Sequence, residues 1–225
     1  MMFAALEINW DVWQTLPGRT LETLGQTLLA SLVVLLIGLP IGVLVHVTEP
    51  GGLRPQVVVH RITTFIVNVG RSVPFIVLMF LLIPVTRWIA GTSIGWRALS
   101  IPLAIGCIPF FARIAENALR GVGKGKVEAA LMVGASRLQV ITGVLLRESL
   151  PGLVGGITVT EVTLIGYSAI TGAVGGGGLG SLAYNYGYSR YMFDVMIIVT
   201  VVFFVIVQVV QMAGDLAARR LDHTR

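Results

Sequence analysis

Five long apolar segments dominate the pattern of hydrophobic and polar positions along this chain. Each carries few charges over about 20 residues, the length that a helix needs to cross hydrocarbon about 30 Å thick. Unpaired backbone groups are costly in lipid, and the alternating strands of a membrane barrel are absent, so each segment is predicted to be helical. The fold class is therefore all-α integral membrane. The five predicted spans are residues 21–46, 62–85, 98–119, 149–172 and 192–215.

The charge content agrees with this interpretation. Only 12% of the 225 residues are charged, whereas soluble domains carry about a quarter. The net charge of +5 could indicate a nucleic acid partner, but no basic cluster is interleaved with aromatic residues as such a module requires. No nucleic acid partner is expected, and the positive charge is better explained by membrane orientation.

The distribution of Lys and Arg predicts that the N-terminus is outside and the C-terminus is inside the cell. This orientation places ten basic residues on the cytoplasmic side and four outside, as the positive-inside rule favours. The long connection 120–148 is then cytoplasmic. The inner residues are Arg54, Arg61, Arg120, Lys124, Lys126, Arg137, Arg147, Arg219, Arg220 and Arg225, and the outer ones are Arg19, Arg87, Arg97 and Arg190.

The connection 120–148 contains the pattern of a short amphipathic helix, which would lie along the membrane surface. We expect Glu128 in its first turn, where the helix dipole favours an acid. Gly134, followed by Ala135, allows a sharp bend or the close approach of another protein. The apolar positions of the predicted helix are Val127, Ala130, Leu131, Val133 and Leu138.

This connection resembles the EAA loop of the permease subunits of bacterial ABC importers. Glu128-Ala129-Ala130 is followed after three residues by Gly134, and after nine more by Val144-Leu145-Leu146. In that family the loop is a coupling helix that docks on the cytoplasmic ATPase. One departure is that Arg147 replaces the expected proline, and Pro151 follows four residues later. The resemblance implies that the ATPase contacts Glu128, Ala129, Ala130, Gly134 and Ala135.

Further motifs narrow the resemblance to the methionine-uptake permeases, and they are spread over nearly the whole chain. This implies one permease domain over residues 1–225, in a homodimer located in the bacterial inner membrane. It also implies two cytoplasmic ABC ATPase subunits and an external methionine-binding lipoprotein as partners. The implied activity is import of L-methionine and possibly D-methionine by alternating access. The matching segments are 70–76, 109–119, 150–154 and 166–188.

No nucleotide-binding motif is expected to function in this chain. Residues 121–126 hold glycines and lysines but no complete P-loop, so a partner must bind ATP and Mg²⁺. Residues 175–180 match the dinucleotide fingerprint, but they follow an apolar span instead of a strand, which favours a re-entrant or closely packed glycine turn. The chain is therefore not predicted to be an enzyme or to hold a cofactor. His46, His60 and His223 are too far apart in sequence to suggest a metal site.

Polar residues inside the spans are the candidates for a translocation pathway. Arg71 would cost about 2.5–3.5 kcal/mol in lipid, so it either stabilises a helix break between Gly70 and Pro74 or lines the pathway. Three roles are open for Glu161: pairing with an arginine, remaining protonated, or lining the cavity, with Thr158 and Ser168 as solvating neighbours. The candidate pathway residues are Arg71, Ser72, Pro74, Thr160, Glu161, Thr163, Tyr167 and Ser168.

Two features leave alternatives open. Gly156, Thr160, Thr163 and Tyr167 share one face of the fourth predicted span, and such a face suits either helix packing or pathway lining. The intramembrane charges would also suit a channel or secondary transporter that acts alone, and an ABC importer could carry another small solute, such as a polar amino acid.

Overall fold

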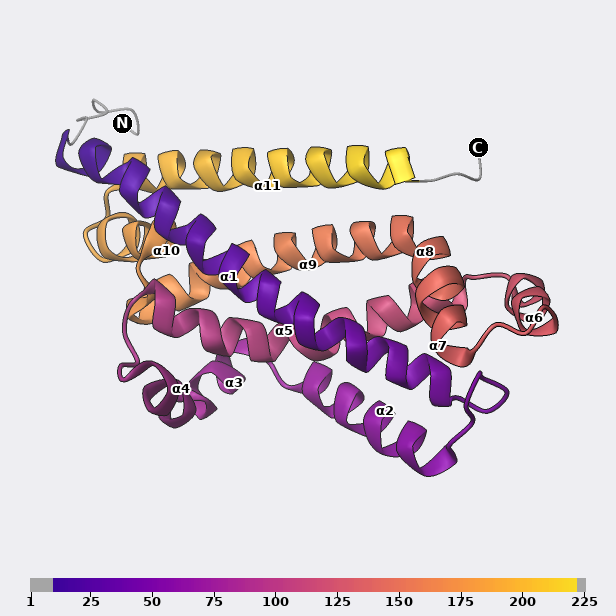
Figure 1. The fold of residues 1–225 in the computed structure, drawn as a ribbon. Coiled ribbons are helices and arrows are strands. Elements are labelled where there is room, and N and C mark those ends of the chain that lie inside the picture. The colour runs from indigo at the N-terminus through magenta and orange to yellow at the C-terminus, as the bar shows by residue number, and fades with distance from the viewer. Residues whose placement is uncertain (1–9, 222–225) are drawn as a thin grey trace. The chain divides into compact units, whose positions relative to one another are not determined.

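The computed structural model describes residues 10–221, and Figure 1 shows that the regular elements among them are all helical. His223 and Arg225 lie outside the described residues. The elements, in which η marks a π-helix, are α1 (Trp10–Thr48), α2 (Val57–Ser72), α3 (Phe75–Leu81), α4 (Ile83–Ala90), α5 (Trp96–Arg120), α6 (Lys124–Met132), α7 (Arg137–Val140), η1 (Ile141–Leu145), α8 (Leu146–Glu148), α9 (Leu150–Thr171), η2 (Gly172–Gly176), α10 (Gly178–Leu182), η3 (Ala183–Tyr188) and α11 (Phe193–Leu221).

Four of the described helices, α1, α5, α9 and α11, are long and apolar enough to cross a membrane. A fifth span exists if α2 and α3 are counted together, although they are bent by 103°. The predicted span 62–85 is therefore present as two helices that meet at a sharp bend, not as one straight helix. Pro74 has no backbone N–H and disfavours helical backbone at the residue before it, and Val73 is accordingly extended, with φ −84° and ψ 125°.

The long helices extend beyond the apolar runs that predicted them. α1 begins at Trp10, not at residue 21, and α11 continues to Leu221, past residue 215. Hydropathy detects the part of a helix that suits lipid, whereas the helical hydrogen-bond pattern can continue into water. The polar turns at these ends were therefore not predicted.

The described residues form two compact units. Unit 1 combines the chain up to Leu32 with Pro74–Ile105 and Glu161–Val210. Unit 2 combines Val33–Val73, Gly106–Thr160 and the chain from Gln211 onward. The helices α1, α5, α9 and α11 each contribute residues to both units.

Small residues bring the helices of unit 2 close together. A methyl group added to Gly42 of α1 would lie 2.7 Å from the carbonyl oxygen of Ala112 in α5 and 2.8 Å from the Cβ of Ala115. One added to Gly156 of α9 would lie 2.5 Å from Ile114. Lipid provides no hydrophobic drive for helix association, so such close packing is a main source of stability.

Residues 172–180 form a tightly packed glycine segment in unit 1. Gly175, Gly177 and Gly178 have φ values of +94°, +73° and +67°, which residues with a side chain rarely adopt. Gly172 packs directly on Gly180, because an added methyl group would lie 2.5 Å from that residue's Cα and carbonyl carbon. The expectation of a closely packed glycine turn at this fingerprint-like sequence is confirmed within unit 1.

Replacing Gly172 with Ala should destabilise the protein, because the new Cβ would meet backbone, which cannot change rotamer. Overpacking of this kind costs about 1–3 kcal/mol, which corresponds to roughly 3–10 °C in melting temperature for a chain of this size. The matched control is Gly166→Ala in α9, where an added Cβ meets nothing within 4 Å. Thermal unfolding in detergent should separate the two variants, and equal melting temperatures would contradict the packing described.

Candidate functional site

The segment between α5 and α9 contains two short helices joined by a well-defined turn. Gly134 follows α6 with φ +86°, and its N–H donates to the carbonyl of Leu131 at 3.0 Å. The N–H of Ala135 donates to the carbonyl of Ala130 at 3.1 Å. These two bonds form a Schellman motif, which requires the left-handed conformation that glycine adopts most easily. The turn thus depends on glycine at position 134.

The next helix, α7, begins with a complete capping box. The Ser136 hydroxyl accepts a hydrogen bond from the backbone N–H of Gln139 at 3.3 Å, and the Ser136 N–H donates to Oε1 of Gln139 at 2.8 Å. The glycine that ends α6, Gly134, and the residue that caps the start of α7, Ser136, therefore lie two residues apart. The prediction of one amphipathic helix is wrong, since Val133 caps α6 and Leu138 belongs to α7.

The position of Glu128 also differs from the prediction. With Gly123 as its N-cap, α6 begins at Lys124, so Glu128 lies in the second turn and not in the first. Glu128, Ala129 and Gly134 are exposed, whereas Ala130 and Ala135 are half-buried. The five predicted coupling residues therefore lie together on α6 and its C-terminal turn.

Large apolar side chains are exposed around this turn. Met132 and Val133 are 83% and 85% exposed, and Leu131 and Leu138 are also exposed. We call these four residues the apolar tip. A cluster of exposed large apolar side chains on a polar segment is typical of a contact surface for a protein or a membrane.

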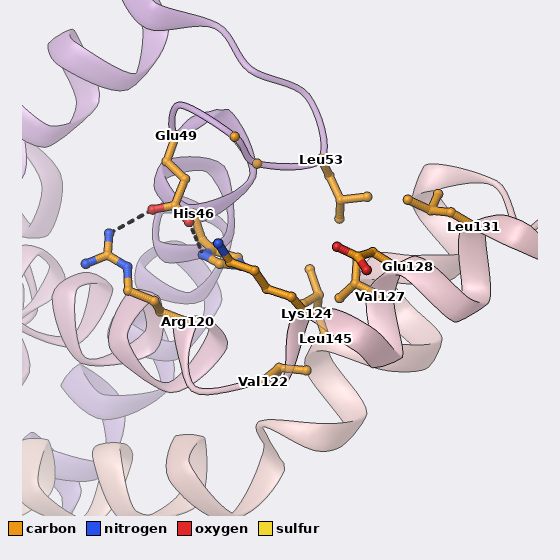
Figure 2. A pocket seen from close by; sticks show the side chains of 12 residues that line it. His46, Glu49, Leu53, Arg120, Val122, Lys124, Val127, Glu128, Leu131 and Leu145 are labelled. Atoms are coloured by element: carbon orange, nitrogen blue, oxygen red, sulfur yellow. Dashed lines mark hydrogen bonds and ion pairs between the residues drawn. The ribbon is translucent and has the colours of Figure 1, made fainter.

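A pocket of about 200 Å³ separates α6 from the loop that follows α1 (Figure 2). Its wall includes Leu53 from the loop and Val127 from α6. Figure 2 shows the Lys124 side chain reaching toward His46, and the Glu128 carboxylate facing Leu53. Within residues 10–221, Lys124 and Glu128 form no salt bridge.

An ion-pair network lies beside this pocket in unit 2. Glu116 is 1% exposed, and both of its carboxylate oxygens are bound. Oε2 accepts from Arg113 at 2.6 Å, and Oε1 accepts from Arg120 at 2.8 Å. Arg120 also donates to Oε2 of Glu49 at 2.8 Å. The other oxygen of Glu49, Oε1, lies 3.2 Å from Nδ1 of His46. Glu49 and Glu116 were not among the predicted site residues, although acids at a span end beside arginines were a usable signal.

Arg147, at the position where the resemblance led us to expect proline, lies exposed in α8. The chain remains helical from α7 through η1 and α8, and a single residue, Ser149, separates α8 from α9. Arginine keeps the backbone N–H that proline lacks. Pro151 then occupies the first turn of α9, where its missing N–H is tolerated.

The predicted pathway residues near the helix break are largely exposed. Arg71 lies exposed in the last turn of α2. The exposed Ser72 donates its hydroxyl hydrogen to the carbonyl of Asn68 at 2.9 Å. Pro74 is the N-cap of α3. A helix break, which one of the two interpretations of Arg71 requires, is thus present, and Arg71 lies next to it.

The polar residues of α9 are bound within the chain. Thr160 and Ser168 are buried and donate to carbonyls of their own helix, those of Gly156 at 2.8 Å and Ile165 at 2.6 Å. Half-buried Tyr167 stacks on Phe75 with a centroid distance of 4.3 Å. Thr163 is also half-buried. The hydroxyls of Thr160 and Ser168 therefore need no partner outside the helix.

Glu161 is 7% exposed, and the hydroxyls of Thr27 and Ser31 of α1 lie beside its carboxylate. Its Oε2 atom has no hydrogen-bond partner among the described residues. Among the described residues, no hydrogen bond joins Glu161 to the predicted neighbours Thr158 and Ser168, whose hydroxyls donate to carbonyls of α9. The i, i+4 spacing of Thr27 and Ser31 is visible in the sequence, but their distance from Glu161 along the chain concealed the pairing.

A polar stripe on α1, also missed from the sequence, binds the glycine segment in unit 1. Glu22 accepts from the N–H of Gly178 at 2.7 Å, and Thr23 accepts from the N–H of Leu179 at 2.9 Å. Arg19 donates to the same Glu22 oxygen at 2.8 Å. The recurrence of polar residues at helical spacing was the available signal. This stripe satisfies the first N–H groups of α10, which would otherwise be unpaired.

Comparisons with known proteins agree on one family. Residues 38–223 match the binding-protein-dependent transport system inner membrane component. The chain is 48% identical over 216 residues to a probable D-methionine transport system permease protein MetI of Vibrio cholerae, covering 96% of this chain and 95% of that protein. It is 44% identical over 179 residues to the methionine import system permease protein MetP of Bacillus subtilis, covering 80% and 81%.

A solved structure agrees with these relatives. Inward-facing conformations of the MetNI methionine ABC transporter include a chain that matches with a TM-score of 0.93 and 44% identity, covering 95% of this chain and 99% of that one. The helical fold, the several apolar spans and the family match together identify a multi-pass inner membrane protein. The chain therefore belongs to the family of binding-protein-dependent transport system inner membrane components.

Proposed function

We propose that this chain is the permease subunit of an ATP-driven ABC importer that carries methionine. The observation that supports this most strongly is the full-length similarity to a chain of the MetNI methionine ABC transporter. Relatives from Vibrio cholerae and Bacillus subtilis that are named for methionine transport support the same substrate. The whole chain acts as one permease domain, and alternating access moves methionine between the two sides.

Its partners follow from this role. A second copy of the chain completes the permease, two cytoplasmic ABC ATPases bind ATP and Mg²⁺, and an external lipoprotein delivers methionine. The permease itself performs no chemistry. An apolar, flexible side chain such as that of methionine needs no charged site for transit, so the selection of substrate can reside largely in the lipoprotein.

The ATPase docks on α6 and its C-terminal turn. The exposed apolar tip offers the kind of surface that becomes buried in a protein interface. The small residues Ala129, Ala130 and Ala135 allow close approach around it. Gly134 fixes the direction of the tip through the Schellman motif. Glu128, exposed and without a salt bridge in residues 10–221, is available to a partner's basic residue.

The orientation is N-terminus outside and C-terminus inside. The excess of Lys and Arg in the loops assigned to the cytoplasm supports it. With this orientation α6, α7 and the ion-pair network lie on the ATPase side. The glycine segment lies toward the outside.

Glu161 is the pathway candidate that the geometry favours most. It is a buried acid in a candidate span, and its Oε2 lacks a partner in the described chain. Intramembrane acids of this kind usually mark a transport route or a polar contact. Exposed Arg71 and Ser72 at the helix break are the next candidates, followed by Pro74, Thr163 and Tyr167. Thr160 and Ser168 would contribute through the shape of α9, because their hydroxyls are bound within it.

Gly134→Leu should separate docking from folding. A leucine at φ +86° is strained by about 1–2 kcal/mol, which should redirect the apolar tip and reduce recovery of the ATPase with the permease about tenfold or more. The control is Gly125→Ala in α6, where an added Cβ meets nothing within 4 Å. Both variants are purified with co-expressed ATPase, and methionine-stimulated ATP hydrolysis is measured in liposomes with the lipoprotein. Full recovery of ATPase with Gly134→Leu would refute docking at this turn.

Single-cysteine labelling should establish the orientation. Cys107 is buried and is replaced with Ala, after which cysteine is placed at Tyr191, which is 89% exposed, or at exposed Arg220. A membrane-impermeant maleimide should label the Tyr191→Cys variant in intact cells, and the Arg220→Cys variant only after permeabilisation. The reverse pattern would overturn the proposed orientation.

Glu161→Leu should change methionine uptake while leaving ATPase recovery unchanged. The leucine removes the only acid of α9 and places an apolar side chain beside the hydroxyls of Thr27 and Ser31. Transport effects of a few fold or more are expected if the carboxylate faces the route. Glu161→Gln, which keeps a polar side chain of the same size beside Thr27 and Ser31, is the control for the loss of charge alone. Unchanged uptake kinetics in the Leu variant would exclude a pathway role.

A further inference from the structure

Arg120, the last residue of α5, joins two acids through a single nitrogen atom. Its Nη2 donates to Oε2 of Glu49 and to Oε1 of Glu116, each at 2.8 Å. Glu49 follows the end of α1, so this atom ties the end of α1 to the end of α5. All three residues belong to unit 2.

The network continues to a third helix. The second oxygen of Glu116 accepts from Arg113 at 2.6 Å, and Arg113 also donates to Oδ1 of Asn68 in α2 at 2.6 Å. Glu116 is buried, so it needs a cation partner, and Arg113 would still provide one if Arg120 were lost. Arg120, in contrast, has a side chain that is 53% exposed. The contacts of Arg120 are therefore dispensable for folding in a way that Glu116 is not.

Arg120 is also the last helical residue before the segment proposed to bind the ATPase. Only residues 121–123 separate it from α6. Figure 2 shows Arg120 on one side of the pocket and Glu128 and Leu131 of α6 on the other. The pocket separates α6 from the loop after α1, so the two do not pack closely there. A displacement of α6 would thus reach α1 mainly through residues 121–123 and Arg120.

An ion pair also joins α6 to the C-terminal end of the connection 120–148. Lys126 in the first turn of α6 pairs with Glu148 of α8 at 2.6 Å, and Glu148 lies two residues before α9. α6 is therefore attached to α8, just before α9, by this ion pair and by its packing on α7 and η1, and to α5 by residues 121–123. A displaced α6 would pull on both attachments.

We infer that Arg120 is a positioning residue for energy coupling: its bridge between Glu49 and Glu116 makes the ends of α1 and α5 move together when the ATPase displaces α6. The inference rests on the proposed docking of the ATPase on α6. It assigns Arg120 no contact with substrate or nucleotide.

The test compares Arg120→Met with Arg120→Lys in the complete complex of permease, ATPase and lipoprotein. Met keeps much of the side-chain volume and removes both hydrogen bonds, whereas Lys keeps one cationic nitrogen that can serve both acids. ATP hydrolysis and methionine uptake are measured in the same liposomes. The matched control is Arg61→Met, since Arg61 is an exposed arginine of α2 in unit 2 without a salt bridge in residues 10–221.

The Met variant should recover the ATPase normally and hydrolyse ATP within about twofold of the parent, while methionine imported per ATP falls about fivefold or more, the scale of a typical coupling energy. The Lys variant should restore most of that ratio, and Arg61→Met should not change it. An unchanged ratio in Arg120→Met, or a proportional loss of hydrolysis and uptake, would overturn the inference. Failure of the proposed function itself would appear instead in the parent, as absent ATPase recovery or absent methionine uptake.

Discussion

Every backbone polar group that enters hydrocarbon must be paired inside the protein, and the rest of this structure depends on that constraint. It makes the described elements helical, because a helix pairs these groups locally. It also determines where the chain can change direction. The bend of 103° between α2 and α3 occurs at Pro74, which has no N–H to pair. The folded glycine segment is possible because Glu22 and Thr23 accept the N–H groups that α10 leaves free.

Close helix contact is the second consequence of a lipid environment. Gly42 and Gly156 in unit 2, and Gly172 in unit 1, allow backbones to approach within distances that a single methyl group would prevent. Packing of this kind replaces the hydrophobic drive that water would supply. Small residues therefore determine how closely these helices approach, alongside buried large apolar side chains such as Phe111 in unit 2 and Leu164 in unit 1.

Buried charged groups also need partners inside the protein. Glu116 is buried with an arginine on each oxygen, and Glu161 is buried beside two hydroxyls of α1. The two acids are suited to different roles. A fully paired acid such as Glu116 fixes helix ends, whereas Glu161, with one oxygen unpaired in the described residues, retains a capacity for another partner. The proposed coupling and transport roles rest on this difference.

The sequence by itself determined the membrane class, four of the five predicted spans as long helices, and the family, because apolar length and local motifs lie in consecutive residues. It also indicated the break near Pro74 and the importance of Gly134. Only the tertiary structure decided which residues meet: Thr27 and Ser31 with Glu161, Glu49 with Arg120, and Glu22 with Gly178. Arg120 and Glu49 are 71 positions apart along the chain, and Gly178 and Glu22 are 156 positions apart. Helical periodicity gives the face on which a side chain lies but not the helix that will pack against it. The division of the connection into α6 and α7 was also hidden, because its apolar spacing resembled one helix until the φ of Gly134 and the Ser136 cap separated them.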